Sequence, residues 1–166
     1  MAASSLPEPA DTAPVEESAG ITLGVDTDTL VHWAMADAPH HQAVRRCFER
    51  EVRRGCRLGL TLQVLREFLH VTTDARRFEH PLAIQDALRL SLELWTGQEV
   101  ARLLPAAQDH DRLCELMHRF QLGRRRILDT ALAVTLAAAG VRRLATLNGR
   151  DFEIFPFLDL VDPRTA

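Results

Sequence analysis

The segment 127–139, ILDTALAVTLAAA, limits the possible folds more than any other part of the chain. Asp129, Thr130 and Thr135 are its only polar residues, so a helix formed here is apolar on nearly every side. Such a helix has to be buried by neighbouring elements. The segment therefore predicts a layered domain, and it raises the question of why a carboxylate, Asp129, lies within it, because an unpaired buried charge is costly.

Short apolar runs alternate with segments of helical periodicity along the rest of the chain. The runs that predict strands are 21–25, 57–60, 99–105, 141–147 and 157–161. The segments that predict helices are 27–37, 41–54, 61–74, 81–95, 106–122 and 127–139. The remaining segment NGRDF, 148–152, predicts a loop. This order is typical of an α/β domain whose mostly parallel sheet lies between helices.

The first twenty residues, MAASSLPEPADTAPVEESAG, are acidic and rich in proline, which predicts a disordered tail ahead of one domain, 21–166. The whole chain has 20 bases and 23 acids, a net charge of −3, and four of those acids lie in the tail. The domain alone therefore has 20 bases and 19 acids, or +1, which neither demands nor excludes a nucleic-acid partner. The tail lacks the basic start and apolar core of a signal peptide, and no run approaches the ~20 apolar residues of a membrane span.

Several absences exclude common chemistries. The three cysteines, Cys47, Cys56 and Cys114, form no CxxC pair, which predicts a reducing cytoplasm and argues against disulfides or a thiolate zinc site. The chain has no lysine, which excludes a phosphate-binding P-loop and Schiff-base catalysis. Beyond the tail the only serine, Ser91, lacks the glycines of a nucleophile elbow. Chemistry based on carboxylates remains the main candidate.

Acidic side chains adjoin the predicted elements at four places. Asp26 follows the first strand, Glu67 lies beside the apolar stripe of its helix, and Asp129 lies near the start of the apolar helix. Asn148 and Asp151 follow a later strand. Each also has an ordinary structural interpretation: an N-cap for Asp26, the helix dipole for Asp129, a solvated surface position for Glu67, and turn formation for the last pair.

The set of acids is more informative than any one of them. Three of the four places are predicted strand ends or helix starts, and they can converge at one edge of a parallel sheet, where α/β proteins place their sites. Carboxylates brought together repel one another, and hard cations such as Mg²⁺ and Mn²⁺, which prefer oxygen ligands, relieve that repulsion. A metal held in this way can generate hydroxide and offset charge on a phosphate, so the set predicts phosphodiester hydrolysis.

Four stretches carry a family resemblance: GVDTDTLV, LTLQVLREFLHV, RILDTALAVTLAAAG and ATLNGRDF. In order and spacing they resemble the PIN-domain nucleases, and above all the VapC-type toxins of bacterial toxin–antitoxin pairs. The resemblance covers about residues 21 to 163. It implies a three-layer α/β/α sandwich with a central, mostly parallel sheet of four to five strands. It further implies an endoribonuclease that uses Mg²⁺ or Mn²⁺ to cut RNA, forms a homodimer and is inhibited by a small VapB-like antitoxin.

The same resemblance suggests a role for each acid. Asp26 and Asp129 correspond to the principal metal ligands, and Glu67 to a residue that binds a second metal or orients water. Asn148 and Asp151 both qualify for the fourth position. We expect Asp151 to be the acid and Asn148 to be a polar helper.

Residues next to these acids are candidates for holding RNA. Thr27 and Thr146 can hydrogen-bond to ligand or substrate. Arg124 and Arg126 can bind phosphates through charge and paired hydrogen bonds, and Arg150 can extend the patch, although a solvated helix start is the more ordinary reading of such a run. The two tryptophans and seven phenylalanines fall mostly at core spacing, so no aromatic platform for stacking bases is expected.

Two other classes of function compete with a nuclease. A non-catalytic PIN-like module that binds RNA or a protein is the main alternative, and the intact set of acids argues against it. An α/β phosphatase or receiver domain built on Asp26 and Asp28 requires a lysine late in the chain, where none occurs.

Overall fold

A computed structural model describes residues 22–165 of the chain. At its centre lies a sheet of five parallel strands in the order β3-β2-β1-β4-β5. The strands are β1 (Thr22–Val25), β2 (Arg57–Thr61), β3 (Val100–Leu103), β4 (Arg143–Ala145) and β5 (Asp159–Val161). The expected disordered tail, 1–20, lies outside the described residues.

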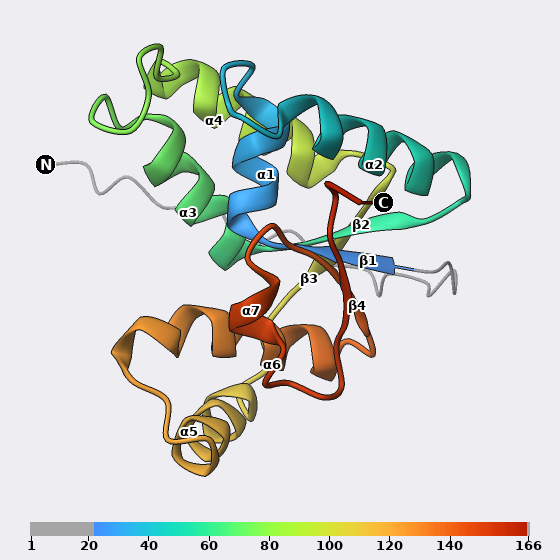
Figure 1. Cartoon of the computed structure of the whole chain (residues 1–166), viewed down its shortest axis with the longest axis vertical. Helices are drawn as coiled ribbons and strands as arrows, with labels where there is room; N and C mark the ends of the chain where they lie inside the picture. The colour runs from blue at the N-terminus through green and yellow to red at the C-terminus, as the bar shows by residue number, and fades with distance from the viewer. Residues whose placement is uncertain (1–21, 166) are drawn as a thin grey trace, which may run out of the picture.

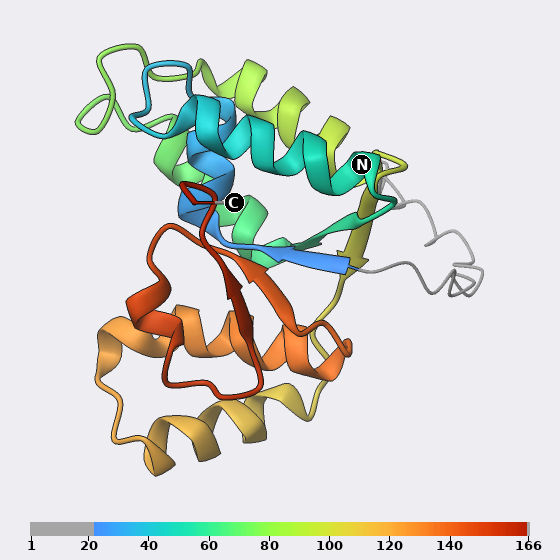
Figure 2. The ribbon, with the colours of Figure 1, turned by 45° about the vertical axis from the view of Figure 1, so that its right-hand side comes forward.

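Helices cover both faces of the sheet, which gives three layers (Figure 1). The first layer holds α1 (Thr27–Ala34), α2 (His41–Arg53), α3 (Leu62–Thr72) and α4 (Ile84–Thr96). The second holds α5 (Asp109–Arg119), the 3₁₀ turn η1 (Arg124–Arg126), α6 (Ile127–Ala138) and the short α7 (Gly149–Phe152). Figure 2 shows the same two layers above and below the strands. The predicted three-layer α/β/α sandwich is therefore confirmed, with five strands.

The apolar helix of the sequence is α6. Thr130 and the run 132–136 are buried, whereas Ile127 and Leu128, at its start, are 43% and 51% exposed. Gly24 in the central strand β1 allows this helix to approach closely, because a Cβ at Gly24 would lie only 2.6 Å from Cδ2 of Leu136. The prediction of a buried helix thus holds for its middle, but not for its first turn or for Ala137 and Ala138 at its end, which are exposed.

Parallel strands bring their carboxyl ends to one edge of the sheet. Asp26 directly follows β1, and Thr146 directly follows β4. Glu67 comes to the same edge on α3, which begins immediately after β2. Asp129 reaches that edge from the opposite layer, on α6. The topology therefore gathers residues that are up to 120 positions apart in the chain.

The structure shortens several predicted elements, for example α1, which ends at Ala34, and α5, which spans Asp109–Arg119, and it changes the kind of element at one place. The segment 148–152 contains the single-turn helix α7 and not only a loop. The turn is closed by hydrogen bonds from the Asp151 N–H to the Asn148 carbonyl at 3.1 Å and from the Glu153 N–H to the Gly149 carbonyl at 3.0 Å. Its reason is burial, because the turn places Phe152 fully inside the core. Within residues 22–165, no helix is long and apolar enough to cross a membrane.

Candidate active site

A hollow of about 530 Å³ opens at the carboxyl edge of the sheet and is lined by residues of α1, α3 and the start of α6. Its lining consists of Asp26, Thr27, Asp28, Val31, His32, Glu67, Val71, Arg77, Phe78, Asp129 and Asn148. Three of the four predicted acids therefore lie around one hollow, together with the predicted Thr27 and Asn148. Asp28 adds a fourth carboxylate.

Asp26 is both the N-cap of α1 and the most perturbed acid of the site. Its Oδ1 accepts the Thr27 N–H at 2.7 Å, and its Oδ2 accepts the Thr146 hydroxyl at 2.9 Å. Burial raises the pKa of Asp26 to about 8, helped by the charges of Asp28 and Asp129 and opposed by the two hydrogen bonds. A carboxyl that ionises so late despite two donors is one whose charged form is disfavoured first by burial and then by neighbouring carboxylates.

Glu67 connects the two helical layers. Its Oε2 accepts the Thr27 hydroxyl at 3.4 Å, and its Oε1 accepts Nε2 of Gln63 at 2.8 Å. The same Gln63 nitrogen donates to the Leu128 carbonyl of α6 at 2.9 Å. Glu67 is therefore oriented by α1 on one side and, through Gln63, by α6 on the other.

Asp28 is an acid of the hollow that the sequence analysis did not include in the site. Its Oδ1 accepts the Thr29 hydroxyl at 3.0 Å and the Leu147 N–H at 3.5 Å, which ties α1 to the end of β4. Its spacing of two from Asp26 was the available signal, and the sequence analysis used it only as part of a phosphatase-like or receiver-like pair.

Arg126 lies between two of the predicted acids. Its Nε donates to Oδ2 of Asp129 at 3.2 Å, and its Nη1 lies 3.3 Å from Oδ1 of Asp151. Its Nη2 is buried and has no hydrogen-bond partner among the described residues. Burial raises the pKa of Asp129, the Arg126 charge opposes that rise, and the charges of Asp151 and Glu67 add to it. The guanidinium thus offsets part of the repulsion among the carboxylates.

The two candidates for the fourth position lie in different places, Asn148 in the lining of the hollow and Asp151 outside it. Asn148 lines the hollow, donates its N–H to the Thr146 hydroxyl at 3.0 Å and donates its side-chain amide to Asp151. Asp151 lies on α7, behind Asn148 and against Arg126, and is not part of the lining. Thr146, 1% exposed, links Asp26 to Asn148.

The oxygen ligands of this site suit a hard cation, but they are not arranged around one. The hollow offers carboxylate, hydroxyl and amide oxygens, which are the ligands that Mg²⁺ and Mn²⁺ prefer. As the side chains stand, residues 22–165 contain no group of three His, Cys, Asp or Glu that could hold a metal ion. Arg126, Gln63 and the two threonines occupy carboxylate oxygens instead. Binding a cation therefore requires these contacts to be exchanged.

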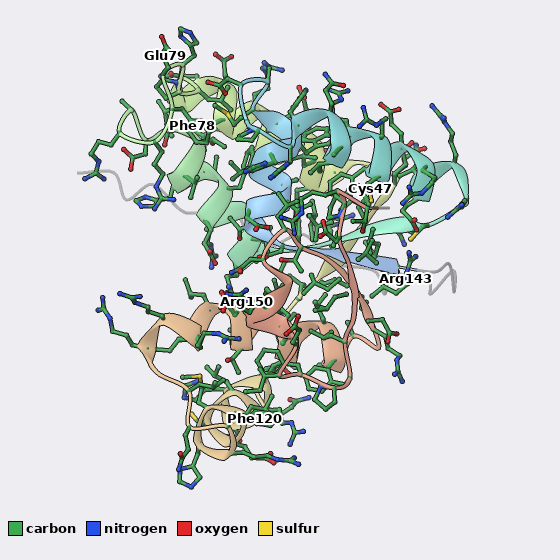
Figure 3. All side chains as sticks on the ribbon, viewed as in Figure 1. Cys47, Phe78, Glu79, Phe120, Arg143 and Arg150 are labelled. Carbon is green, nitrogen blue, oxygen red and sulfur yellow. The ribbon has the colours of Figure 1, made fainter. Side chains whose placement is uncertain are left out.

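The other end of the hollow was not predicted. Val31 and His32 on α1, Val71 on α3, and Arg77 and Phe78 in the following loop line it. The loop has no periodicity that points to a site, and the two helices meet only in the folded chain. Arg124, on the exposed 3₁₀ turn, and Arg150, on α7 (Figure 3), do not line the hollow and stay predicted contacts for RNA.

A parallel five-stranded sheet with carboxylates gathered at its edge is the arrangement expected of a PIN-domain protein. No family model matches the chain. Ribonuclease VapC33 of Mycobacterium tuberculosis, found in strains CDC 1551 / Oshkosh and ATCC 25618 / H37Rv, is 31% identical over 136 residues, which are 81% of this chain and 92% of the relative. The chain therefore belongs to the VapC family of ribonucleases.

Solved structures of low sequence identity share the fold. Mycobacterium tuberculosis VapC20, a toxin that cleaves the sarcin–ricin loop, matches with a TM-score of 0.59 and 16% identity over 74% of this chain and 86% of its own. Rickettsia felis VapBC2, bound to a DNA fragment from its promoter, matches with a TM-score of 0.60 and 18% identity. The match covers 85% of this chain and 98% of that one. A toxin–antitoxin complex from Klebsiella pneumoniae matches with a TM-score of 0.56 and 14% identity. The match covers 85% of this chain and 97% of that one.

Proposed function

We propose that this protein is a divalent-metal-dependent endoribonuclease whose carboxylates Asp26, Asp129 and Glu67 hold the metal. The observation that carries the proposal is the hollow at the sheet edge, in which burial and neighbouring carboxylates raise the pKa of Asp26 to about 8. Such a concentration of negative charge is relieved by a cation. Membership of the VapC ribonuclease family supports RNA as the substrate.

Each residue then has a separate task. A bound Mg²⁺ or Mn²⁺ would activate water as the nucleophile and would offset charge on the scissile phosphate. Asp26 and Asp129 hold the metal from opposite layers of the sandwich, while Glu67 binds a second ion or orients water. The hydroxyl groups of Thr27 and Thr146 keep Glu67 and Asp26 oriented, as outer partners of metal ligands commonly do.

Asp151 and the arginines complete the proposed site. Asp151 becomes available to the metal or its waters when Arg126 leaves it, and Asn148 keeps it oriented. Arg126, released from the acids, joins Arg124 and Arg150 in binding phosphates of the RNA backbone. The unpartnered Nη2 of Arg126 supports this role, since it is a donor without an acceptor among the described residues.

We further infer that the protein is a toxin of the cytoplasm, that it forms a homodimer, and that a VapB-like antitoxin inhibits it. The Rickettsia felis and Klebsiella pneumoniae neighbours are toxin–antitoxin assemblies. On one face of α4, Ile84, Leu88 and Leu92 are 49%, 51% and 63% exposed, and apolar area of this kind is typical of a surface that a partner covers. Light scattering of the chain with and without the antitoxin measures both assemblies.

The experiment that tests the enzyme is cleavage of total RNA by purified protein with Mg²⁺, Mn²⁺ or EDTA. We expect discrete fragments that require metal and that disappear with Asp26→Asn. Asp37→Asn is the matched control, because Asp37 is an exposed acid outside the hollow. If the folded, metal-loaded protein cuts no RNA, the nuclease proposal is wrong and the non-catalytic binding module takes its place.

A further inference from the structure

We propose that the end of the hollow away from the acids is a subsite for a nucleobase of single-stranded RNA, with Phe78 as the ring on which the base stacks. The proposal rests on the ribonuclease function, because the base belongs to a nucleotide next to the phosphate that the carboxylates serve. It adds a substrate-binding residue in a loop that the sequence analysis left without any role.

Along α1 and α3 the lining of the hollow changes from carboxylates to two valines and His32. Thr27 on α1 and Glu67 on α3 are hydrogen-bonded to each other at the acidic end. Exactly four residues further on each helix, Val31 and Val71 line the same hollow. Four residues are about one helical turn, or about 5.4 Å along the axis. An apolar wall therefore begins about one turn from the carboxylates, within reach of an adjacent nucleotide.

Phe78 completes the apolar wall from the loop between α3 and α4 (Figure 3). Its ring is half-buried, with one part against the core and another part on the hollow. Arg77 lines the hollow beside it, with a side chain that is 58% exposed. An aromatic face next to a guanidinium is how proteins bind single-stranded nucleic acid, since the ring stacks on the base and the arginine binds phosphate.

The loop that carries Phe78 is held in place by its own hydrogen bonds. The carboxylate of Asp74 accepts the Arg76 N–H at 2.9 Å and the Arg76 guanidinium at 3.0 Å. The Arg77 N–H donates to the Asp74 carbonyl at 3.0 Å, and the Leu82 N–H donates to the Thr72 carbonyl at 2.9 Å. A loop held in this way loses little conformational entropy when a base stacks on Phe78, which favours binding.

Photocrosslinking tests where the bases lie. The probe is a single-stranded RNA with randomised sequence and 4-thiouridine in place of uridine, incubated with the wild-type protein in EDTA so that the strand stays intact. We expect crosslinks in the tryptic peptide 78–89, which begins at Phe78. Crosslinks confined to other peptides, or no crosslink from a protein that cuts RNA when metal is present, overturn the subsite.

Kinetics test what the ring contributes. On an RNA oligomer that spans a cut found in total RNA, Phe78→Leu should raise KM about tenfold, whereas Phe78→Trp should keep it near the wild-type value. Phe120→Leu is the matched control, because Phe120 is also half-buried but lies at the other end of the molecule, at the end of α5 (Figure 3). Equal melting temperatures of the two leucine variants exclude a folding defect as the cause.

The outcomes separate this inference from the function on which it rests. Metal-dependent cleavage with the same KM in wild type and Phe78→Leu overturns the subsite and leaves the ribonuclease standing. A wild-type protein that neither cuts nor crosslinks RNA overturns both. A raised KM in Phe78→Trp equal to that in Phe78→Leu also contradicts stacking, because it shows that only the shape of the phenyl ring matters.

Discussion

Asp26 combines a structural and a chemical role in one side chain. As N-cap it accepts the Thr27 N–H, and as an acid it lies where burial and Asp28 oppose its charge. An ordinary interpretation and a functional one therefore hold together at this residue. Asparagine at this position keeps an acceptor for the same N–H and removes the charge, so it separates the two roles.

The stability of the metal-free protein should fall as pH rises because of Asp26. Its pKa is about 8 in the folded protein against an ordinary 3.8, so folding takes up a proton between these values. The stabilising contribution is full below about pH 4 and is lost as pH rises through about 8. We expect the free energy of unfolding in EDTA to fall by at most about 6 kcal/mol over this range, and Asp26→Asn to remove most of that fall. Urea unfolding at pH 5, 7 and 9 measures it, and parallel curves for the two proteins would contradict it.

In the proposed function, Arg126 and the metal compete for the same two acids. Its guanidinium holds Asp129 and Asp151, which a metal would also use. We expect Arg126→Gln to bind Mn²⁺ about fivefold more tightly in calorimetry, because a partly exposed ion pair contributes about 1 kcal/mol that the metal no longer has to overcome. The same variant should melt at a lower temperature in EDTA, since its acids lose their counter-charge. Arg125→Gln, an exposed arginine of the same turn, is the control. Equal Mn²⁺ affinity in both variants would show that Arg126 does not compete with metal.

At the scale of elements, the close packing of β1 against α6 holds the two halves of the site in register. Gly24 is two residues before Asp26, and a Cβ there would lie 2.6 Å from Cδ2 of Leu136. We expect Gly24→Ala to destabilise the protein by about 1–3 kcal/mol in urea unfolding, since the buried Leu136 side chain or the helix that carries it must shift. Gly123→Ala is the control, because an added Cβ at Gly123 meets no atom within 4 Å. If both variants unfold at the same urea concentration, the contact between β1 and α6 is adaptable.

Most helices and strands were predictable from the sequence, whereas the residues that they bring together in the site were only partly predictable. Buried strands and amphipathic helices leave periodic signals in the sequence, so the sheet, the apolar helix and the strand-end acids were expected. The helix α7 was missed because it depends on the burial of Phe152, which is a tertiary effect. The apolar end of the hollow was missed because Phe78 is brought to it by the packing of α1 against α3 and by a loop without periodicity. Contacts between distant segments leave no local signal.

At the scale of the whole molecule, the site joins the two helical layers across the edge of the sheet. Asp26 and Glu67 come from the layer of α1 and α3, and Asp129 comes from the layer of α6. A cation held by all three would cross-link these layers, which the hydrogen bond of Gln63 to Leu128 already joins. Metal binding should therefore be measurable as global stability and not only as activity.

Divalent metal should raise the melting temperature, and it should do so more at high pH than at low pH. Below about pH 8 a proton on Asp26 competes with the metal, whereas above it the carboxylate is ionised and available. A ligand at a hundred times its Kd stabilises the folded state by about 2.7 kcal/mol, which corresponds to roughly 5–10 °C for a domain of this size. We expect a shift of that order with Mg²⁺ or Mn²⁺ at pH 9, a smaller one at pH 6, and little shift at either pH in Asp26→Asn. Calorimetric scans with metal and with EDTA measure these shifts.

An unchanged melting temperature at millimolar metal would count against a clustered site. An equal shift at both pH values would show that the metal binds without displacing the proton of Asp26, and hence that Asp26 is a cap and not a ligand.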